Sequence, residues 1–291
     1  MSESDFLGDI RVAILGLGLM GGSLALALRG HCRLLMGSDP DAITLGAAQQ
    51  LNLFDHLSPD PAEILPQADL VILAAPVRAI LGLIRQLPEL HPGKAVVLDL
   101  GSTKNEICQA LAALPPRFDA LGGHPMCGRE TSGLANAEAG LYQRAVFALA
   151  ALPRTSSRAR NLAEELVHAI GAHPLWLEPA THDRWVAVTS HLPYLLAICL
   201  ANSLPEEAAP LVGPGGLSTT RLASSASGMM ADVLDSNRVN LLQALGVFQQ
   251  QLDNLEARLR EDTRAGLLEM LEKGSAARAD QLDDKLTRSR I

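Results

Sequence analysis

The sequence has few aromatic residues, no paired cysteines and little positive charge. Aromatic side chains make up 3% of its 291 residues. The four cysteines, at positions 32, 108, 127 and 199, form no Cys-X-X-Cys pair. Their spacing argues against a zinc knuckle and a disulfide framework, and it favours a reducing cytoplasm. The formal net charge is −8, and no nucleic-acid partner is expected, because nucleic-acid binders present a basic face.

Long apolar runs are missing as well. No stretch of about 18 residues is free of polar interruption, so neither a transmembrane helix nor a membrane partner is expected. The N-terminus, MSESDFLGDIRVAILG, has no basic segment before its apolar run and does not resemble a signal peptide. Hydrophobic residues nevertheless make up 48% of the chain. This composition suits a globular protein that is long enough for two domains.

Short apolar runs alternate with helical patterns over the first 178 residues. Continuous apolar strands separated by helices are typical of βαβ units. An α/β Rossmann-type, doubly wound parallel sheet is therefore predicted, with a short edge strand at 174–179. Its other strands are expected at 11–16, 33–39, 70–76, 95–101 and 147–152.

The pattern becomes helical from residue 179. Residues 181–204 predict a long, largely apolar helix interrupted near Pro193, and residues 237–274 carry apolar positions at i, i+3 and i+4 for many turns. The expected organisation is a dinucleotide-binding domain over residues 1–178 and an all-helical substrate-binding and dimerisation domain over residues 179–291. Because the apolar stripe is longer than one helical domain can bury, a homodimer through this domain is expected.

The segment GLGLMGG follows the first expected strand and opens the first expected helix. In that context its glycines match a dinucleotide-binding fingerprint. Gly16 permits a tight turn, Gly18 lets the backbone approach a pyrophosphate, and Gly21 allows close packing of helix on sheet. Free N–H groups at the helix N-terminus, around Leu19 and Met20, complete the expected phosphate site.

Asp39 lies at the end of the second expected strand, where an acidic residue would bond the adenosine ribose hydroxyls. The alternative is an exposed turn that its side chain caps. The segment GSDPDAIT contains no arginine or lysine that could hold a 2′-phosphate. NAD is therefore the expected cofactor.

The segment GGHPMCGRETSG contains the strongest candidate for catalysis. Its order of residues suits neither a helix nor a strand. The Gly122–Gly123 pair would let the backbone pass close to a ligand, and Pro125 would stiffen the exit. A lone histidine is usually structural, but the cofactor fold, the loop and the nearby Glu130 favour a catalytic His124. The usual histidine pKa of about 6.5 suits proton removal near neutral pH.

Five segments occur in the order seen in prephenate and arogenate dehydrogenases of tyrosine biosynthesis, and the chain resembles this family from about residue 11 to residue 273. The patterns GGHPMxGxExSG and SHLP are far more specific than the nucleotide loop. The five segments are GLGLMGGSLALAL, LDLGSTK, GGHPMCGRETSG, THDRWVAVTSHLPY and GPGGLSTTRLA.

The resemblance implies roles for individual residues. His124 is similar to the family's catalytic histidine, and Ser102 to the serine that bridges the substrate hydroxyl, the histidine and the nicotinamide. His191 resembles a second active-site histidine that helps to place the ring end of the substrate. Alternatively, Ser102 is the N-cap of the helix that begins TKNEI, and His191 is a buried structural histidine. Pro76 and Val77 resemble the loop on the nicotinamide side of the cofactor.

The resemblance also implies a substrate-binding set. Arg221 is similar to the arginine that binds a substrate carboxylate, a task that suits its planar fork, with a surface salt bridge as the alternative. Glu130 resembles the acidic residue at the mouth of the site, with a structural cap as the alternative. Ser190 is assigned to the same site, and Arg129 is considered as an additional cation. His182 is expected to cap or pack at the start of the long helix and is left out of the catalytic set.

The implied activity is NAD-dependent oxidative decarboxylation of prephenate to 4-hydroxyphenylpyruvate, or of arogenate to tyrosine. Loss of carbon dioxide makes the ring aromatic, so no metal is expected. Two other classes of protein are alternatives. The β-hydroxyacid dehydrogenases share the GLGxMG start but normally place a catalytic lysine in the helical domain, whereas residues 181–260 contain none. An NAD-sensing module would have no use for a histidine, a serine and an arginine at the nicotinamide.

Overall fold

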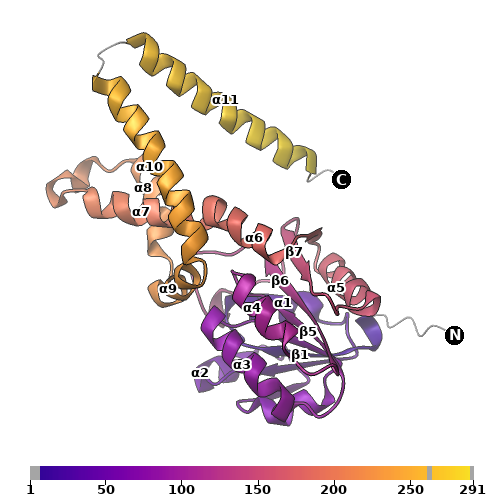
Figure 1. The fold of residues 1–291 in the computed structure, drawn as a ribbon. Helices are drawn as coiled ribbons and strands as arrows, with labels where there is room; N and C mark the ends of the chain where they lie inside the picture. Colours follow the sequence, from indigo (N-terminus) through magenta and orange to yellow (C-terminus); the bar gives the residue numbers. More distant parts are fainter. Residues whose placement is uncertain (1–6, 261–263, 289–291) are drawn as a thin grey trace. The chain divides into compact units, whose positions relative to one another are not determined.

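The computed structural model describes residues 7–260 and 264–288. The chain divides into two compact units, of which the first runs to Arg238 and the second begins at Val239. The first unit contains a twisted sheet with helices on both faces (Figure 1). The second unit contains the long helices α10 (Arg238–Arg260), apart from its first residue, and α11 (Arg264–Arg288).

The sheet has eight strands in the order β3-β2-β1-β4-β5-β6-β7-β8. The strands from β3 to β6 are parallel, β7 is antiparallel to β6, and β8 is parallel to β7. The doubly wound, mainly parallel fold is confirmed, and β7 and β8 run opposite to the other six strands. The bounds are β1 Arg11–Leu15, β2 Leu34–Ser38, β3 His56–Ser58, β4 Leu70–Leu73, β5 Ala95–Asp99, β6 Phe118–Pro125, β7 Val146–Ala151 and β8 His173–Trp176.

The reversal of β7 follows from its connection to β6. Residues 126–145 contain only the short 3-10 helix η4 (Leu134–Asn136) and no crossover helix. A parallel neighbour would require a crossover that carries the chain back to the other edge of the sheet. Without one, the chain re-enters the sheet at the edge where β6 leaves it, and β7 must run in the opposite direction.

Two strands were not expected from the sequence, β3 and β6. The three-residue β3 is too short to give a periodic signal. β6 includes Gly122, Gly123 and His124 and ends at Pro125, so the prediction that this segment is not a strand is wrong. Glycine and proline have low strand propensity, but β6 is paired with β5 on one side and with β7 on the other.

Strand residues alternate between two apolar clusters. In β1, Val12 and Ile14 face one cluster, and Ala13 and Leu15 face the other. The first cluster includes residues of α1 (Leu19–Leu28), α2 (Ala42–Gln50) and α5 (Ser157–Ala169). The second includes residues of α3 (Val77–Leu90) and α4 (Asn105–Ala112). The sheet is therefore buried on both faces, and the segments that follow its strands form one edge where a site can lie.

The apolar helical run after the sheet is interrupted, as predicted near Pro193. It consists of α6 (Pro179–Val186), the π-helical turn η5 (Ala187–His191) and α7 (Leu192–Ser203). The N–H of Leu192 bonds to the carbonyl of Ala187, five residues earlier. Because Pro193 has no N–H and its ring clashes with the preceding turn, the helix widens there rather than continuing regularly. In this turn His191 is buried and Ser190 is exposed.

By length and composition alone, the run Pro179–Ser203 could cross a membrane, and 33% of its apolar window is buried inside the protein. Core helices meet the same criterion. The run contains Asp183, His182 and His191, all at most 2% exposed. Charged and titratable side chains are costly in lipid, so these residues favour a core helix.

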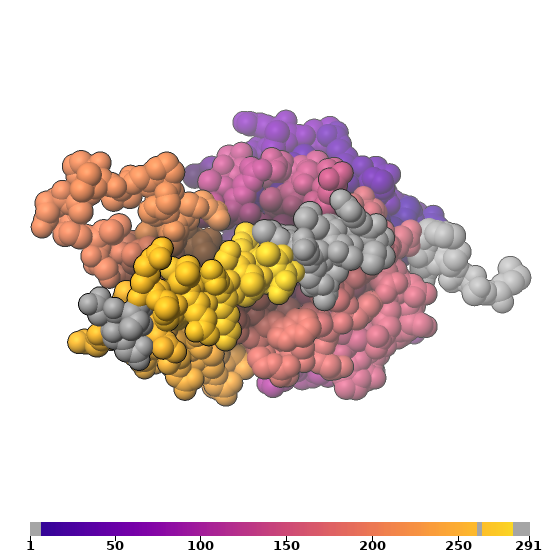
Figure 2. Space-filling model, turned by 90° about the horizontal axis from the view of Figure 1, so that it is seen from above, coloured from indigo at the N-terminus to yellow at the C-terminus, as the bar shows by residue number. Residues whose placement is uncertain are grey.

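The rest of the first unit is made of short helices, one of which begins at the candidate residue Arg221. They are mostly exposed, and in the space-filling view the orange segment stands out from the mass formed by residues 7–178 (Figure 2). These helices are η6 Glu206–Leu211, α8 Pro214–Thr220, η7 Arg221–Ser224 and α9 Ser227–Ser236.

A buried ion pair joins β5, β6 and the start of α4. The Lys104 ammonium pairs with the Asp99 carboxylate, and the two side chains are 1% and 0% exposed. The same ammonium donates to the carbonyl of Gly123 over 2.6 Å. Asp99 also accepts the N–H groups of Gly101 and Gly123 over 2.8 and 3.1 Å. All the charge in this part of the core is therefore matched by hydrogen bonds.

We expect Lys104→Met to lower the free energy of unfolding by about 3–5 kcal/mol, because it leaves a buried carboxylate without its counter-ion. The double variant Lys104→Met/Asp99→Asn removes the charge and should recover part of that loss. Urea unfolding followed by circular dichroism measures both. A single variant as stable as the wild type would contradict the assignment of a desolvated pair.

Candidate active site

The glycine loop between β1 and α1 leaves open space where a phosphate could bind. Gly16 has φ +95°, and a Cβ there would lie 2.5 Å from the carbonyl oxygen of Ala74. A Cβ at Gly21 would lie 1.9 Å from the carbonyl oxygen of Gly16. At Gly18 a Cβ would meet no atom within 4 Å, and this residue caps α1 without a side-chain hydrogen bond. The first N–H groups of α1 are thus left for a ligand, as a dinucleotide pyrophosphate requires.

Leu19 and Met20 begin α1, and their side chains belong to the core. Leu19 is 8% exposed, Met20 packs against the first apolar cluster, and the Met20 carbonyl accepts the Tyr142 hydroxyl over 2.7 Å. Any contact of these two residues with a cofactor would be made by the backbone. The same holds for Val77, which is 2% exposed, whereas Pro76 at the start of α3 is exposed.

Asp39 directly follows β2 and is tied to the glycine loop. Its Oδ2 accepts the N–H of Leu17 over 2.8 Å, and its Oδ1 accepts the N–H of Asp41 over 2.9 Å. Asp41, rather than Asp39, is the N-cap of α2, where it accepts the N–H groups of Ile43 and Thr44. A ribose-binding carboxylate and a turn-forming carboxylate are therefore compatible at Asp39.

Three side chains connect β6 to α6 and α4. Nδ1 of His124 lies 2.9 Å from Nε2 of His182, and Nδ1 of His182 lies 2.8 Å from Oδ1 of Asp183. Asp183 also accepts the N–H of Lys104 over 2.7 Å and the N–H of Asn105 over 2.8 Å. His182 and Asp183 are buried, and His124 is partly exposed at the carboxyl edge of the sheet.

The start of α4 is therefore capped from outside the helix. The alternative prediction that Ser102 is its N-cap is wrong, because the cap residue is Lys104, which makes no side-chain cap bond. The two free N–H groups instead meet the Asp183 carboxylate, which suits the positive end of a helix. Among the residues that the structure describes, the Ser102 hydroxyl has no hydrogen-bond partner. Ser102 follows β5 at the same sheet edge as His124 on the neighbouring β6.

The two glycines before His124 are required by the packing of β6. A Cβ at Gly122 would lie 2.8 Å from Sγ of Cys108 and 3.1 Å from Cδ of Lys104, and one at Gly123 would lie 2.6 Å from the carbonyl oxygen of Asp99. The close neighbours are protein atoms of β5, α4 and the residue before α4. These glycines let β6 lie against the buried ion pair.

The electrostatic environment keeps His124 neutral. Burial lowers the pKa of His124 well below its usual value, and the neighbouring His182, Lys104 and His191 lower this pKa further. Burial also lowers the pKa of His191 to about 4, against the opposing effect of Asp183. The expectation that His124 titrates near the usual histidine pKa is thus wrong. Its neutral, proton-accepting form persists to lower pH.

His191 lies in the same polar network, at the π-helical turn. It is 1% exposed. Nδ2 of Asn237 lies 3.2 Å from Nδ1 of His191 and 2.7 Å from the carbonyl oxygen of Asp183. The structure thus connects both predicted histidines to the same aspartate, His124 through His182 and His191 through Asn237.

Of the four predicted substrate-binding residues, three take part in ion pairs and the fourth, Ser190, is exposed. Arg221, at the start of η7, pairs with Glu130, and Arg129 pairs with Glu138. Arg221 remains 59% exposed, so a ligand carboxylate could reach it. Ser190 is exposed on the outer side of its turn. Among the described residues, no hydrogen bond or ion pair joins these side chains to the histidine network.

Four residues of the network were missed from the sequence as parts of the site: His182, Asp183, Lys104 and Asn237. The adjacent His-Asp pair in THDRW and the lysine in GSTK were visible, but nothing in the spacing says that His182 meets a residue 58 positions earlier. Among the described residues, no group of three or more histidine, cysteine, aspartate or glutamate side chains is arranged to hold a metal ion.

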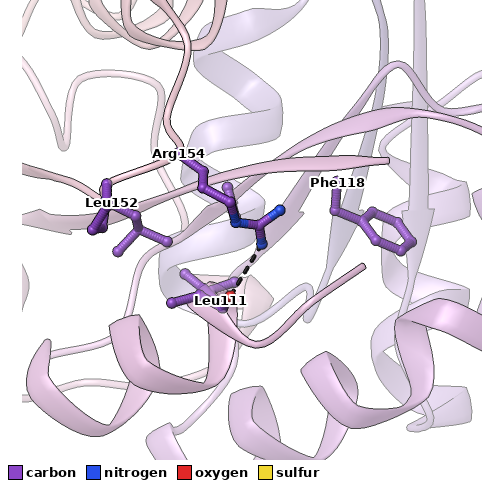
Figure 3. Close-up of a pocket in the computed structure, with 7 residues that line it drawn as sticks. Leu111, Phe118, Leu152 and Arg154 are labelled. Atoms are coloured by element: carbon purple, nitrogen blue, oxygen red, sulfur yellow. Dashed lines mark hydrogen bonds between the residues drawn. The ribbon is translucent and has the colours of Figure 1, made fainter. Parts of the chain in front are cut away.

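A small pocket lies away from this site. Its volume is about 210 Å³, and Leu111, Phe118, Leu152 and Arg154 are among its lining residues (Figure 3). Phe118 begins β6, so the pocket is at the opposite end of that strand from His124. Arg154 donates to the carbonyls of Ala112 and Leu114 over 3.0 and 2.8 Å and closes the end of α4. Its role here is to satisfy a helix C-terminus.

Comparison with known proteins matches the chain almost from end to end. A family model described as the prephenate dehydrogenase nucleotide-binding domain matches residues 24–175, and one described as the prephenate dehydrogenase dimerization domain matches residues 178–273. The prephenate dehydrogenase of Bacillus subtilis (strain 168) is 30% identical over 268 residues, which cover 88% of this chain and 72% of that protein.

Two solved structures share the fold over nearly their whole length. Prephenate dehydrogenase from A. aeolicus, in complex with hydroxyphenyl propionate and NAD+, is 28% identical with a TM-score of 0.86, and the match covers 93% of this chain and 98% of that one. Synechocystis arogenate dehydrogenase is 26% identical with a TM-score of 0.79, and the match covers 94% of this chain and 100% of that one. The glycine loop, the histidine network and these matches agree: the chain belongs to the prephenate dehydrogenase family.

Proposed function

We propose that the protein is an NAD-dependent dehydrogenase that converts prephenate to 4-hydroxyphenylpyruvate and carbon dioxide. The observation that carries the proposal is a neutral, partly exposed His124 at the sheet edge that also bears the glycine loop. Arogenate is the second candidate substrate, because one similar structure is an arogenate dehydrogenase. The absence of any arginine or lysine near Asp39 in GSDPDAIT supports NAD over NADP.

In the proposed reaction, the ring carbon that bears the hydroxyl loses a hydride. NAD, when bound, accepts that hydride. His124 takes the proton of the hydroxyl, and Ser102, whose own hydroxyl is unpartnered within the described part of the chain, orients it. The ring carboxylate then leaves as carbon dioxide, and its bonding electrons make the ring aromatic as the proton returns to the phenol oxygen. The electron pair that leaves as hydride is the only one lost from the substrate.

The other candidate residues receive roles in the same proposal. Gly16, Gly18 and Gly21 form the loop for the pyrophosphate, and Asp39 binds the adenosine ribose. Arg221 releases Glu130 and binds a substrate carboxylate in its place. His191 lies toward the ring end of the substrate. Pro76, Val77 and the backbone of Leu19 and Met20 would contact the cofactor, while Ser190 and Arg129 have weaker support, since one is exposed and the other is paired with Glu138.

The proposed domain boundary stays at residue 178, with the dinucleotide-binding domain at 1–178 and the helical domain at 179–291. The two family models, which end at 175 and begin at 178, support this division. A cytoplasmic location is proposed from the four free cysteines. Recovery of the protein in a membrane or secreted fraction would contradict the location.

The direct test is incubation of the purified protein with NAD and either prephenate or arogenate while NADH absorbance is followed. We expect turnover of prephenate with NAD and a much lower kcat/KM with NADP, because the Asp39 carboxylate repels a 2′-phosphate. Equal use of both cofactors would contradict the role of Asp39. No turnover of either substrate would contradict the proposed function.

We expect His124→Asn to lower kcat by about 10²- to 10⁴-fold while NAD still binds, because asparagine can form a hydrogen bond but cannot take the proton. Because the pKa of His124 is lowered, neutral His124 persists as the pH falls through 6.5. The acid limb of the wild-type kcat/KM should therefore lie below that pH. His168→Gln, on an exposed histidine outside the network, should leave both quantities unchanged. An acid limb that persists in His124→Asn would assign the proton acceptor to another group.

Arg221→Ala should raise KM for the substrate by roughly 10- to 150-fold and change kcat less, since a carboxylate contact serves ground state and transition state alike. That range corresponds to about 1.5–3 kcal/mol for a charged hydrogen bond. Arg29→Ala removes an exposed arginine elsewhere and is the matched control. An unchanged KM would leave Arg221 as a surface partner of Glu130.

The helical domain is proposed to form a homodimer. The family model that matches residues 178–273 is described as a dimerization domain, and α10 alone exposes five large apolar side chains: Val239, Leu242, Val247, Leu252 and Leu259. Apolar surface of this extent usually finds a partner. Light scattering should give twice the chain mass at micromolar concentration. A stable monomer there would contradict the proposal.

A further inference from the structure

The buried network around Asp183 determines where the protons of two histidines lie. An ionised carboxylate can only accept hydrogen bonds. Oδ1 of Asp183 lies 2.8 Å from Nδ1 of His182, so that nitrogen must carry the hydrogen. When the His182 ring is neutral it has this one N–H, and its Nε2 is then a lone-pair acceptor.

The position of the hydrogen on His182 determines that on His124. Its Nδ1 lies 2.9 Å from Nε2 of His182, and a bond between two ring nitrogens needs one donor and one acceptor. Since Nε2 of His182 accepts, Nδ1 of His124 donates. The one hydrogen of neutral His124 is thus used inside the network, and its Nε2 has a free lone pair.

His191 has the opposite arrangement. Nδ2 of Asn237 lies 2.7 Å from the carbonyl oxygen of Asp183, which can only accept, so this atom is the amide nitrogen and a donor. Its second hydrogen is directed to Nδ1 of His191 over 3.2 Å. Nδ1 of His191 must therefore accept, and the hydrogen of this ring is on Nε2.

We propose that the Asp183–His182 pair and Asn237 are positioning residues that hold His124 and His191 in opposite tautomers, so that Nε2 of His124 accepts a proton and Nε2 of His191 donates a hydrogen bond. The catalytic roles in this inference rest on the proposed dehydrogenase function. The tautomers themselves follow from the hydrogen bonds alone. His182, which was expected only to cap or pack, thereby gains a role through His124.

The assignment separates the tasks of the two histidines. When His124 takes the substrate hydroxyl proton on Nε2, its Nδ1–H stays bonded to His182, whose own N–H stays bonded to the Asp183 carboxylate. The new positive charge is thus connected through one ring to a fixed negative charge. The N–H of His191 suits an acceptor such as a carboxylate oxygen of the substrate. His191 cannot replace His124 as the proton acceptor while Asn237 occupies its other nitrogen.

A purely structural role for Asp183 is the competing explanation, because this carboxylate also caps α4 through Lys104 and Asn105. A cap alone predicts that variants of the network change stability, with no defined tautomer on His124. Replacing Asp183 removes the cap and the network together and cannot separate the two explanations. His182 is the better position, since the residues that the structure describes give its side chain only the bonds to His124 and Asp183.

The first test is nitrogen-15 NMR of the histidine-labelled protein at pH 7.5, without substrate. Signals are assigned by their loss in His124→Asn and in His191→Asn. We expect a protonated Nδ1 with an unprotonated Nε2 on His124, and the reverse on His191. The same tautomer on both rings, or an unprotonated Nδ1 on His124, would overturn the inference.

The second test compares two variants of one residue. In His182→Gln the side-chain oxygen can still accept the Nδ1–H of His124, whereas His182→Leu offers no acceptor. We expect His182→Leu to lower kcat by about 100-fold or more with little change in KM, and His182→Gln to recover at least 10-fold of that loss. Thermal unfolding of both variants reports any shared loss of stability. Equal kcat for the two variants would overturn the inference.

These tests separate the inference from the proposed function. If the NMR tautomers are as expected but neither prephenate nor arogenate is turned over with NAD, the proposed function fails and the tautomer assignment stands. If the wild type turns over prephenate but the tautomers are reversed, the inference fails and the function stands.

Discussion

The carboxylate of Asp183 is the interaction on which the site depends. It is fully buried, and it bonds to the two free N–H groups at the start of α4 and to His182. A single charge therefore fixes α6 against α4 and orients the histidine next to His124. The cost of burying this charge is offset because a helix N-terminus and an N–H donor surround it. The same group thus stabilises the fold and determines the protonation of the candidate base.

A buried ion pair stabilises the end of β6 that carries His124. The Lys104–Asp99 pair bonds the backbone of Gly123, the residue before His124. Glycine is needed at positions 122 and 123, because a Cβ at either position would be too close to the neighbouring atoms of this part of the core. Lys104 also helps to hold the pKa of His124 low. The position and the neutrality of the candidate base therefore follow from one arrangement of the core. At the start of α4, the Lys104 ammonium bonds to the sheet, and the N–H groups of Lys104 and Asn105 bond to Asp183 of α6.

The sequence was most informative where structure is local. The glycine loop, Asp39 and the interruption at Pro193 were predicted because each depends on a few neighbouring residues, and a specific motif drew attention to His124. The reversal of β7 was not predicted, because it depends on a connection without a crossover. β6 was not recognised as a strand, because pairing on both sides outweighs the low propensity of Gly-Gly. The bond between His124 and His182 joins residues 58 positions apart, and no local pattern encodes it. The alternative that Ser102 caps α4 was wrong for the same reason, since the group that bonds to this helix end is far away in the sequence.

The central claim is that Nε2 of His124 is the atom that meets the reacting hydroxyl. The most direct measurement is a crystal structure of the protein with NAD and the product-like ligand hydroxyphenyl propionate. The account predicts the phenol oxygen within about 2.6–3.2 Å of Nε2 of His124, with the His182 and Asp183 contacts unchanged. A phenol oxygen bound by His191 or by another group, with His124 out of reach, would contradict it.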